Sequence, residues 1–307
     1  MVVLRLGQLA DAIHECERLD ERGKLERALE RTVDLAPAFG LHTVSIYDRY
    51  RMTASTEDAG SVAADAESRR AGRELVLDLV FRPLSNALVP VLARLGLTPP
   101  AVVLANAAVG LVAALALARG ELLAAAVLLQ LKTLLDNSDG QLARAAGRVT
   151  LVGRYLDTEA DLVVNAVIFA ALGHVTGQPL LAATAFVALT IVLAVDFNTT
   201  ELYREVRGSP QPPPVATGGR GERLLTRIYE LVFGPLDRGI RRISRPGSID
   251  RFTVTVLANL GLSTQLVVLG ACLALGAPEA YLWIVLACLV AVVALQLRVE
   301  RRARAGR

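Results

Sequence analysis

Long apolar stretches follow one another from residue 101 toward the end of the chain, and each has about the length that crosses a bilayer as a helix. The second and third stretches contain several charged side chains, yet they remain long enough to span. This pattern predicts an all-α integral membrane protein with six transmembrane helices. The predicted spans are residues 101–118, 122–145, 151–175, 180–197, 252–275 and 281–299.

Two amphipathic segments accompany these spans. Between residues 74 and 100, apolar positions at helical spacing alternate with arginines, which is typical of a helix lying in the membrane interface. Pro99 and Pro100 predict a turn between this helix and the first span. Residues 200–251 predict a Pro- and Gly-rich cytosolic strap followed by one basic amphipathic helix at the interface.

The ends of the chain are strongly charged. Residues 1–73 are rich in Glu and Arg and predict a small helical cytosolic extension, which we expect to be dispensable for catalysis. Residues 300–307 predict a basic cytosolic tail. The first residues lack the basic, apolar and small-residue order of a signal peptide, so no cleavage is expected.

Arginine placement predicts how the spans are oriented. The first, third and fifth connections are short and nearly free of cations, whereas the other connections and both termini hold the arginines. By the positive-inside rule, both termini are expected on the cytoplasmic side of a multi-pass plasma-membrane protein. The same topology puts the connected ends of spans two and three on the cytoplasmic side.

Composition adds little beyond this class. Hydrophobic residues make up 53% of the chain and the mean hydropathy is +0.45, well above soluble usage. A formal net charge of +3 indicates no nucleic-acid partner. Three cysteines, at positions 16, 272 and 288, imply no disulfide framework.

An acidic pattern at the ends of spans two and three carries the chemistry, because charges are costly in a membrane segment. Each span places its members of the pattern on one face at helical spacing. If Gly147 and its neighbours form the bend, the two faces oppose each other and four carboxylates converge. Such carboxylates repel one another unless cations separate them, and oxygen ligands suit Mg²⁺ or Mn²⁺. The pattern consists of Asp136, Asp139, Gly140, Ala143 and Arg144 on span two, and Gly153, Asp157 and Asp161 on span three.

Two other interpretations compete with a metal site. The aspartates can form a structural ion-pair network with Arg144, Arg148 and Arg154, although buried pairs seldom repay their desolvation. They can also belong to a nonenzymatic or transport protein that binds a cation, although transporter carboxylates usually lie near the bilayer midplane beside broken helices. Lys132 either pairs with Asp136 or extends to the membrane interface, or else it binds a substrate phosphate.

The complete acidic pattern resembles the signature of the CDP-alcohol phosphatidyltransferase family, with every fixed position filled. The resemblance covers residues 75–299. It implies transfer of a phosphatidyl group from CDP-diacylglycerol to an alcohol, with release of CMP, in phospholipid biosynthesis. It also implies a homodimer in the lipid bilayer.

The same resemblance implies roles for individual residues. Two Mg²⁺ or Mn²⁺ ions would be held by Asp136, Asp139, Asp157 and Asp161, and Asp161 would take the proton of the acceptor hydroxyl. Gly140, Ala143 and Gly153 would leave room for the nucleotide, and Arg144 would meet the diphosphate. Tyr203, Arg204 and Arg207 are similar to residues that bind phosphorylated acceptors, which favours inositol phosphate or glycerol phosphate. With Arg220, these arginines otherwise serve as positive-inside charges.

Polar residues inside the other spans have a simpler interpretation. Asn106, Asn165, Asn259 and Gln265 are expected to form hydrogen bonds between helices rather than to bind a ligand.

Overall fold

A computed structural model describes residues 72–145, 149–207, 214–216, 218–244 and 246–305. Nearly all of the predicted extension, and Gly147 with its neighbours, lie outside these residues. The described part is helical, and its β-type pairing is limited to one bridge between Thr150 and Val215. The all-α prediction is confirmed for this part of the chain.

The connections between the elements are short, except for residues 207–219 between α9 and α10. In chain order the elements are η2 (Leu77–Phe81), α5 (Arg82–Arg94), α6 (Pro99–Ala118), α7 (Leu122–Ala145), α8 (Leu151–Thr176), α9 (Pro179–Val206), α10 (Arg220–Val232), α11 (Gly234–Ile243), η3 (Pro246–Ser248), α12 (Arg251–Ala258), α13 (Leu262–Ala274) and α14 (Pro278–Ala305).

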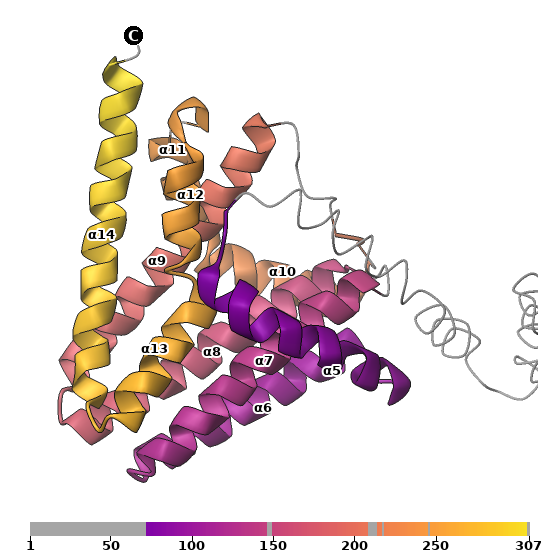
Figure 1. Ribbon diagram of the computed structural model, residues 1–307. Coiled ribbons are helices and arrows are strands. Elements are labelled where there is room, and N and C mark those ends of the chain that lie inside the picture. The colour runs from indigo at the N-terminus through magenta and orange to yellow at the C-terminus, as the bar shows by residue number, and fades with distance from the viewer. Residues whose placement is uncertain (1–71, 146–148, 208–213, 217, 245, 306–307) are drawn as a thin grey trace, which may run out of the picture.

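The long helices pack around a core of small and branched residues (Figure 1). Helix α6 packs against both α7 and α8, and α13 lies along α7. Helix α9 contacts α8 and α14, whereas α5 crosses α7. Ala113, Ala114 and Ala125 are buried where α6 meets its neighbours, and small side chains of this kind let membrane helices approach closely.

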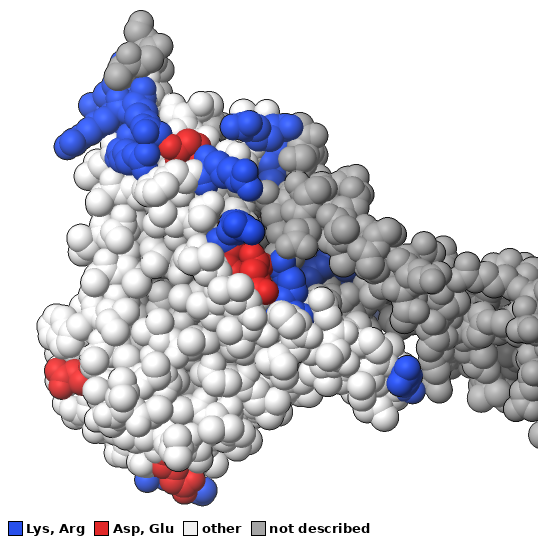
Figure 2. Space-filling view, in the orientation of Figure 1, with Lys and Arg blue, Asp and Glu red and all other residues white. Residues whose placement is uncertain are grey.

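The length and apolar composition of the helices indicate a multi-pass membrane protein. Four of them, α6, α8, α9 and α14, are long and apolar enough to cross a bilayer, and the pair α12 and α13 makes up to five. Figure 2 shows a broad uncharged surface on one face, with basic side chains gathered toward one end. Helix α7 has the length of a span, but its charged residues exclude it from this set, so the sixth span remains a prediction.

The prediction of one continuous helix over residues 252–275 was wrong. This segment forms two helices, α12 and α13, which meet at an angle of 42°. Asn259 lies at the break, where its side-chain amide donates to the Arg73 carbonyl at 2.6 Å and its oxygen accepts from the Leu75 N–H at 2.9 Å. The break therefore binds the segment that precedes α5.

Prolines correct two further boundaries. Pro99 and Pro100 do not form a turn but begin α6, with Thr98 as the N-cap residue, because the first helical positions need no backbone N–H. The single amphipathic helix predicted after the strap is two helices, α10 and α11, separated at Phe233. Pro235 stands in the first turn of α11, where its ring cannot continue the preceding helix.

Candidate metal centre and adjoining cavity

The acidic faces of α7 and α8 oppose each other, as their spacing predicted. One carboxylate oxygen from each of Asp136, Asp139 and Asp157 lies within 4.8 Å of the other two. These three residues come from two helices whose approach is fixed by their shared packing on α6. The arrangement offers three oxygen ligands to one cation.

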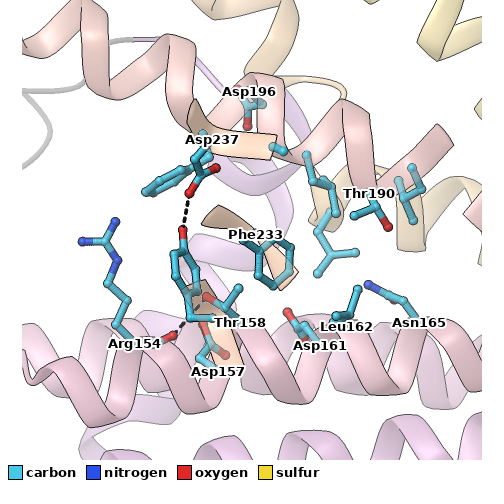
Figure 3. Close-up of a pocket in the computed structure, with 16 residues that line it drawn as sticks. Arg154, Asp157, Thr158, Asp161, Leu162, Asn165, Thr190, Asp196, Phe233 and Asp237 are labelled. Atoms are coloured by element: carbon cyan, nitrogen blue, oxygen red, sulfur yellow. Dashed lines mark hydrogen bonds between the residues drawn. The ribbon is translucent and has the colours of Figure 1, made fainter. Parts of the chain in front are cut away.

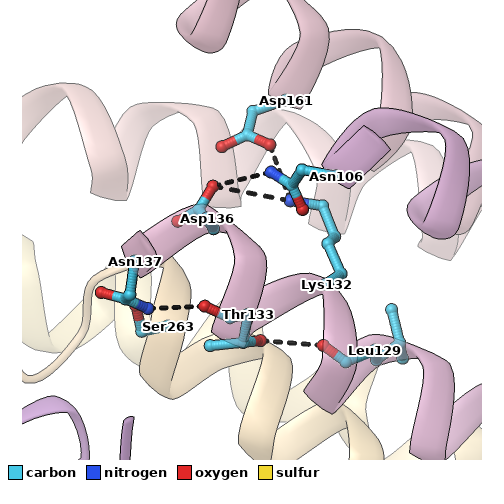
Figure 4. A network of polar contacts seen from close by, with 8 residues as sticks. All are labelled: Asn106, Leu129, Lys132, Thr133, Asp136, Asn137, Asp161 and Ser263. Carbon is cyan, nitrogen blue, oxygen red and sulfur yellow. Dashed lines mark hydrogen bonds and ion pairs between the residues drawn. The ribbon is translucent and has the colours of Figure 1, made fainter. Parts of the chain in front are cut away.

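Asp161 lies one turn beyond Asp157 and has a different neighbour. Its Oδ1 atom is 2.7 Å from the Nζ atom of Lys132, whose side chain is fully buried. The same Nζ atom is 3.9 Å from Asp136 Oδ1 (Figure 4). The predicted pairing of Lys132 with Asp136 is thus confirmed, and a shorter contact with Asp161 joins it.

Room for this lysine comes from a glycine on α6. A Cβ atom at Gly110 would lie 2.4 Å from Val164 Cγ1 and 3.2 Å from Lys132 Cδ. Any side chain at position 110 would therefore displace the lysine stem or the valine on α8. Gly110 was not among the predicted site residues, since a glycine inside an apolar helix gives no charge signal.

Asn106, also on α6, completes the polar contacts of the cluster. Its Nδ2 atom donates to Asp136 Oδ1 at 3.1 Å (Figure 4). The expectation that Asn106 bonds between helices is confirmed. Asn259 instead bonds to the backbone of the segment before α5, as described above, and the Gln265 amide donates to Cys288 Sγ on α14 at 3.5 Å.

The cluster fits a hard divalent cation. Asp139 Oδ2 and Asp157 Oδ1 are buried and have no hydrogen-bond partner among the described residues, although a buried carboxylate oxygen is costly to leave unpaired. Three aspartates also supply oxygen ligands alone, which Mg²⁺ and Mn²⁺ prefer. Lys132 balances only part of their combined charge.

The glycines of the pattern flank the cluster. A Cβ atom at Gly140 would lie 3.4 Å from Arg144 Nη1, one turn further along α7. At Gly153 it would lie 3.2 Å from Thr150 Oγ1, which accepts the Gly153 N–H and caps α8. Ala143 is half-buried on the same stretch of α7, and Arg144 is exposed. This small-residue surface lies next to the carboxylates and beside an arginine.

A cavity of about 290 Å³ adjoins the cluster between α8, α9 and the two lid helices α10 and α11. Asp157 and Asp161 line it from α8, and Asp196 lines it from α9 on the other side (Figure 3). Tyr229 and Asp237 reach it from α10 and α11. Two of the four residues predicted to bind metal, Asp157 and Asp161, thus share a cavity with two further aspartates.

Contacts among the lid residues hold α10 and α11 over this cavity. The Tyr229 hydroxyl donates to Asp237 Oδ2 at 2.9 Å (Figure 3), and Asn198 Nδ2 donates to Asp237 Oδ1 at 2.7 Å. The Tyr229 ring packs on Tyr155 of α8 with centroids 4.7 Å apart. Burial, and then the Asp237 carboxylate, raise the pKa of Tyr229, so its hydroxyl remains a donor at neutral pH.

The predicted acceptor-phosphate residues do not line the cavity. The Nη1 atom of Arg204 pairs with Glu201 Oε1 at 3.1 Å, and the guanidinium of Arg207 lies 5.2 Å from the ring centre of Tyr203. Arg154 does line the cavity, stacked on Phe197 at 5.0 Å. The Arg148 of the alternative ion-pair network lies outside the described residues.

Sequence reasoning missed Asp196 although a signal was available. It is the one acidic residue in the predicted span 180–197, and an ionisable group in such a segment is a functional candidate by default. Asp196 lies one residue before the end of that span, close to the predicted polar strap.

Comparison with known proteins places these residues in a family. Residues 97–219 match the model of the CDP-alcohol phosphatidyltransferase family, a range that contains all four aspartates of the pattern. The chain is also similar to the "Inner membrane protein YnjF" of Escherichia coli (strain K12), with 39% identity over 88 residues. That alignment covers 29% of this chain and 42% of the relative, so it spans less than half of either protein. The acidic cluster and the family match agree, and the chain contains a CDP-alcohol phosphatidyltransferase domain over residues 97–219.

Proposed function

We propose that this protein transfers a phosphatidyl group from CDP-diacylglycerol to an alcohol and releases CMP, in phospholipid biosynthesis. The observation that carries the proposal is the approach of three carboxylates from α7 and α8 within 4.8 Å of one another, inside the segment that matches the family. Asp136, Asp139, Asp157 and Asp161 would hold the two Mg²⁺ or Mn²⁺ ions. When bound, such ions stabilise the charge that develops on a diphosphate leaving group.

Other residues bind the nucleotide and the diphosphate and accept the proton of the acceptor. The small surface of Gly140, Ala143 and Gly153 admits the nucleotide, and Arg144 at its edge pairs with the diphosphate. The acceptor oxygen forms a bond to the phosphorus of the phosphatidyl group while the bond from that phosphorus to the CMP oxygen breaks. The proton of the acceptor hydroxyl passes to the Asp161 carboxylate.

Lys132 positions this base. Its ammonium group lies 2.7 Å from Asp161 Oδ1, and the lysine side chain is fully buried. A fixed charge-assisted contact of this kind orients the carboxylate toward the cavity that it lines. We assign Lys132 this positioning role in place of a substrate-phosphate contact.

Sequence reasoning also favoured a phosphorylated polyol as acceptor, bound by Arg204 and Arg207. Arg204 is engaged with Glu201, and Arg207 stacks on Tyr203. Inositol phosphate and glycerol phosphate therefore enter the proposal as acceptors to be compared with unphosphorylated alcohols. We further propose a homodimer with its termini and active site on the cytoplasmic side.

CMP release tests the reaction. Full-length protein in lipid nanodiscs, given CDP-diacylglycerol and a mixture of alcohols, should release CMP with Mg²⁺ or Mn²⁺ and stop when EDTA is added. Asp157→Asn should lower the rate by about a hundredfold or more, since it removes a ligand. Asp78→Asn is the matched control, because Asp78 pairs with Arg82 at 2.7 Å outside α7 and α8. Equal CMP release by Asp157→Asn and the control would refute the proposal.

Cation transport is the second candidate function. The break between α12 and α13 favours it, because transporters use discontinuous helices beside their ion sites. Ser263 of α13 lies within 3.4 Å of Asn137, the residue after Asp136 on α7. Uptake of Mn²⁺ into liposomes by the protein, without CMP release under any condition, would select transport over transfer.

A further inference from the structure

The cavity beside the acidic cluster is itself acidic. Asp157 and Asp161 line it from α8, Asp196 from α9 and Asp237 from α11. Among the described residues that line it, Arg154 is the one basic residue. Bound metal ions would neutralise the α8 side, whereas among the described residues Arg204 is the cation that acts on Asp196.

The two aspartates away from the cluster have neutral partners. Asp237 accepts from the Tyr229 hydroxyl and the Asn198 amide, at 2.9 and 2.7 Å. Arg241 Nε reaches Asn198 Oδ1 at 3.3 Å, so this guanidinium contacts the amide. Both hydrogen bonds leave the negative charge of Asp237 in place.

Like Asp157, Asp196 has one unpaired carboxylate oxygen, although its carboxylate also accepts from the Thr200 hydroxyl. Its Oδ1 atom is buried and has no hydrogen-bond partner in the part of the chain that the structure describes. Arg204, which lies on the same helix two turns further on, pairs with Glu201 at 3.1 Å. A buried carboxylate oxygen with no partner is costly, and it lies in the wall of a cavity that a ligand can fill.

The rest of the cavity wall is mainly apolar. Leu162, Leu189, Leu193 and Leu262 line it, and three aromatic rings, those of Phe197, Tyr229 and Phe233, accompany them. Thr158, Asn165 and Thr190 also line the cavity and can bond hydroxyl groups, so it is the charge of the aspartates that separates a cationic acceptor from a neutral polyol. An alkyl ammonium group suits both the rings and the carboxylate, and a phosphate would be repelled by the aspartates.

We propose that the acceptor is an amino alcohol, whose ammonium group is received by Asp196 while its hydroxyl lies toward Asp161. This inference rests on the proposed transfer reaction and deepens it. It replaces the phosphorylated acceptor that the sequence favoured. Asp196 thereby becomes the residue that selects among acceptors by charge.

Acceptor competition on the unmodified protein tests this directly. Full-length protein in nanodiscs with CDP-diacylglycerol and Mg²⁺ is given ethanolamine, ethylene glycol or glycerol 3-phosphate, and CMP and lipid product are measured. Ethanolamine and ethylene glycol differ chiefly in the charged group. We expect kcat/KM for ethanolamine to exceed that for the diol by about tenfold or more, the factor that about 1.4 kcal/mol gives.

Asp196→Asn identifies the residue responsible. We expect it to reduce the preference for ethanolamine over ethylene glycol about tenfold, chiefly through a higher KM for ethanolamine. Glu279→Gln, which removes an exposed carboxylate that accepts from Trp283 at the start of α14, should keep the wild-type preference.

The possible failures are distinguishable. Equal or greater turnover of ethylene glycol or glycerol 3-phosphate by the wild-type protein overturns the amino-alcohol inference and leaves the transfer reaction standing. An unchanged preference in Asp196→Asn overturns the assignment of that residue. No CMP release with any of the three acceptors or with a mixture of alcohols that includes inositol phosphate, from folded protein that binds Mn²⁺, overturns the transfer reaction and the inference together.

Discussion

The Nζ atom of Lys132 on α7 lies 2.7 Å from Asp161 Oδ1 on α8, and the lysine side chain has no exposed surface. We predict that Lys132→Gln destabilises the protein by about 3 kcal/mol, because removing one partner of a buried pair leaves the other charge uncompensated. CMP release should fall as well, since Asp161 loses the group that orients it. Thermal unfolding in nanodiscs measures the first effect.

Arg238→Gln is the control for this variant, because the Arg238–Glu230 pair is well exposed and lies 3.3 Å apart. Exposed pairs contribute about 0–1 kcal/mol. Equal unfolding temperatures for Lys132→Gln and Arg238→Gln would contradict the assigned role of Lys132.

Gly110→Ala tests the space that the lysine needs. The added methyl would lie 2.4 Å from Val164 Cγ1 and 3.2 Å from Lys132 Cδ, and overpacking of this kind costs about 1–3 kcal/mol. We predict a lower unfolding temperature and a loss of CMP release. Gly239→Ala on α11, where a Cβ atom would meet nothing within 4 Å, should be neutral or slightly stabilising. A Gly110→Ala protein as stable and active as Gly239→Ala would refute the packing argument.

Tyr229→Phe removes the hydroxyl that ties α10 to Asp237 of α11 at 2.9 Å. We expect faster tryptic cleavage within the two lid helices, because a lost hydrogen bond to a charged group is worth about 1.5–3 kcal/mol. Tyr155→Phe keeps the ring that packs on Tyr229 and serves as the control. Identical cleavage rates for both variants would show that the hydroxyl does not hold the lid.

The pH dependence of this tie has a defined sign. Burial, followed by Asp237, raises the pKa of Tyr229, so its stabilising contribution is fully present below the unfolded pKa of about 10. It is lost only as the pH rises through the higher folded pKa. The ratio of the tryptic cleavage rates of Tyr229→Phe and the wild type, both measured at the same pH, should therefore be constant from about pH 6 to about pH 9.

Metal binding should stabilise the protein through the cluster. At a concentration a hundredfold above its Kd, a divalent ion adds about 2.7 kcal/mol to the free energy of unfolding. We expect Mn²⁺ to raise the unfolding temperature of the wild type and EDTA to reverse the change. Asp139→Asn should abolish the response, because Asp139 is one of the three close carboxylates. A full response in Asp139→Asn would rule out this site.

Helical periodicity was enough to predict the opposed acidic faces of α7 and α8. Asp136 and Asp139 share one turn of α7, and Asp157 faces them from α8. Spacing within one helix also paired Lys132 with Asp136, but it could not reveal the closer contact with Asp161, which depends on how the two helices pack. Nor could it reveal Gly110, whose importance lies only in what surrounds it.

Other features depend on tertiary contacts or on local backbone geometry, which a hydropathy pattern does not report. The break between α12 and α13 interrupts a stretch that is apolar enough to read as one span. The partners of Asn259 at that break are 184 and 186 residues away in the chain. Asp196 lies at the end of a predicted span. Its place in the cavity could not be predicted, because the cavity is formed by the packing of α8, α9 and the lid helices.

The two hydrogen bonds between the Asn259 side chain and the backbone at Arg73 and Leu75 limit how far the N-terminal extension can be shortened. A deletion that ends at residue 70 leaves both partners of the amide intact. One that continues through residue 75 removes them and frees the junction next to Leu262, which forms part of the cavity wall. Shortened proteins should therefore lose acceptor turnover abruptly between these two end points, although neither removes any residue of the acidic cluster.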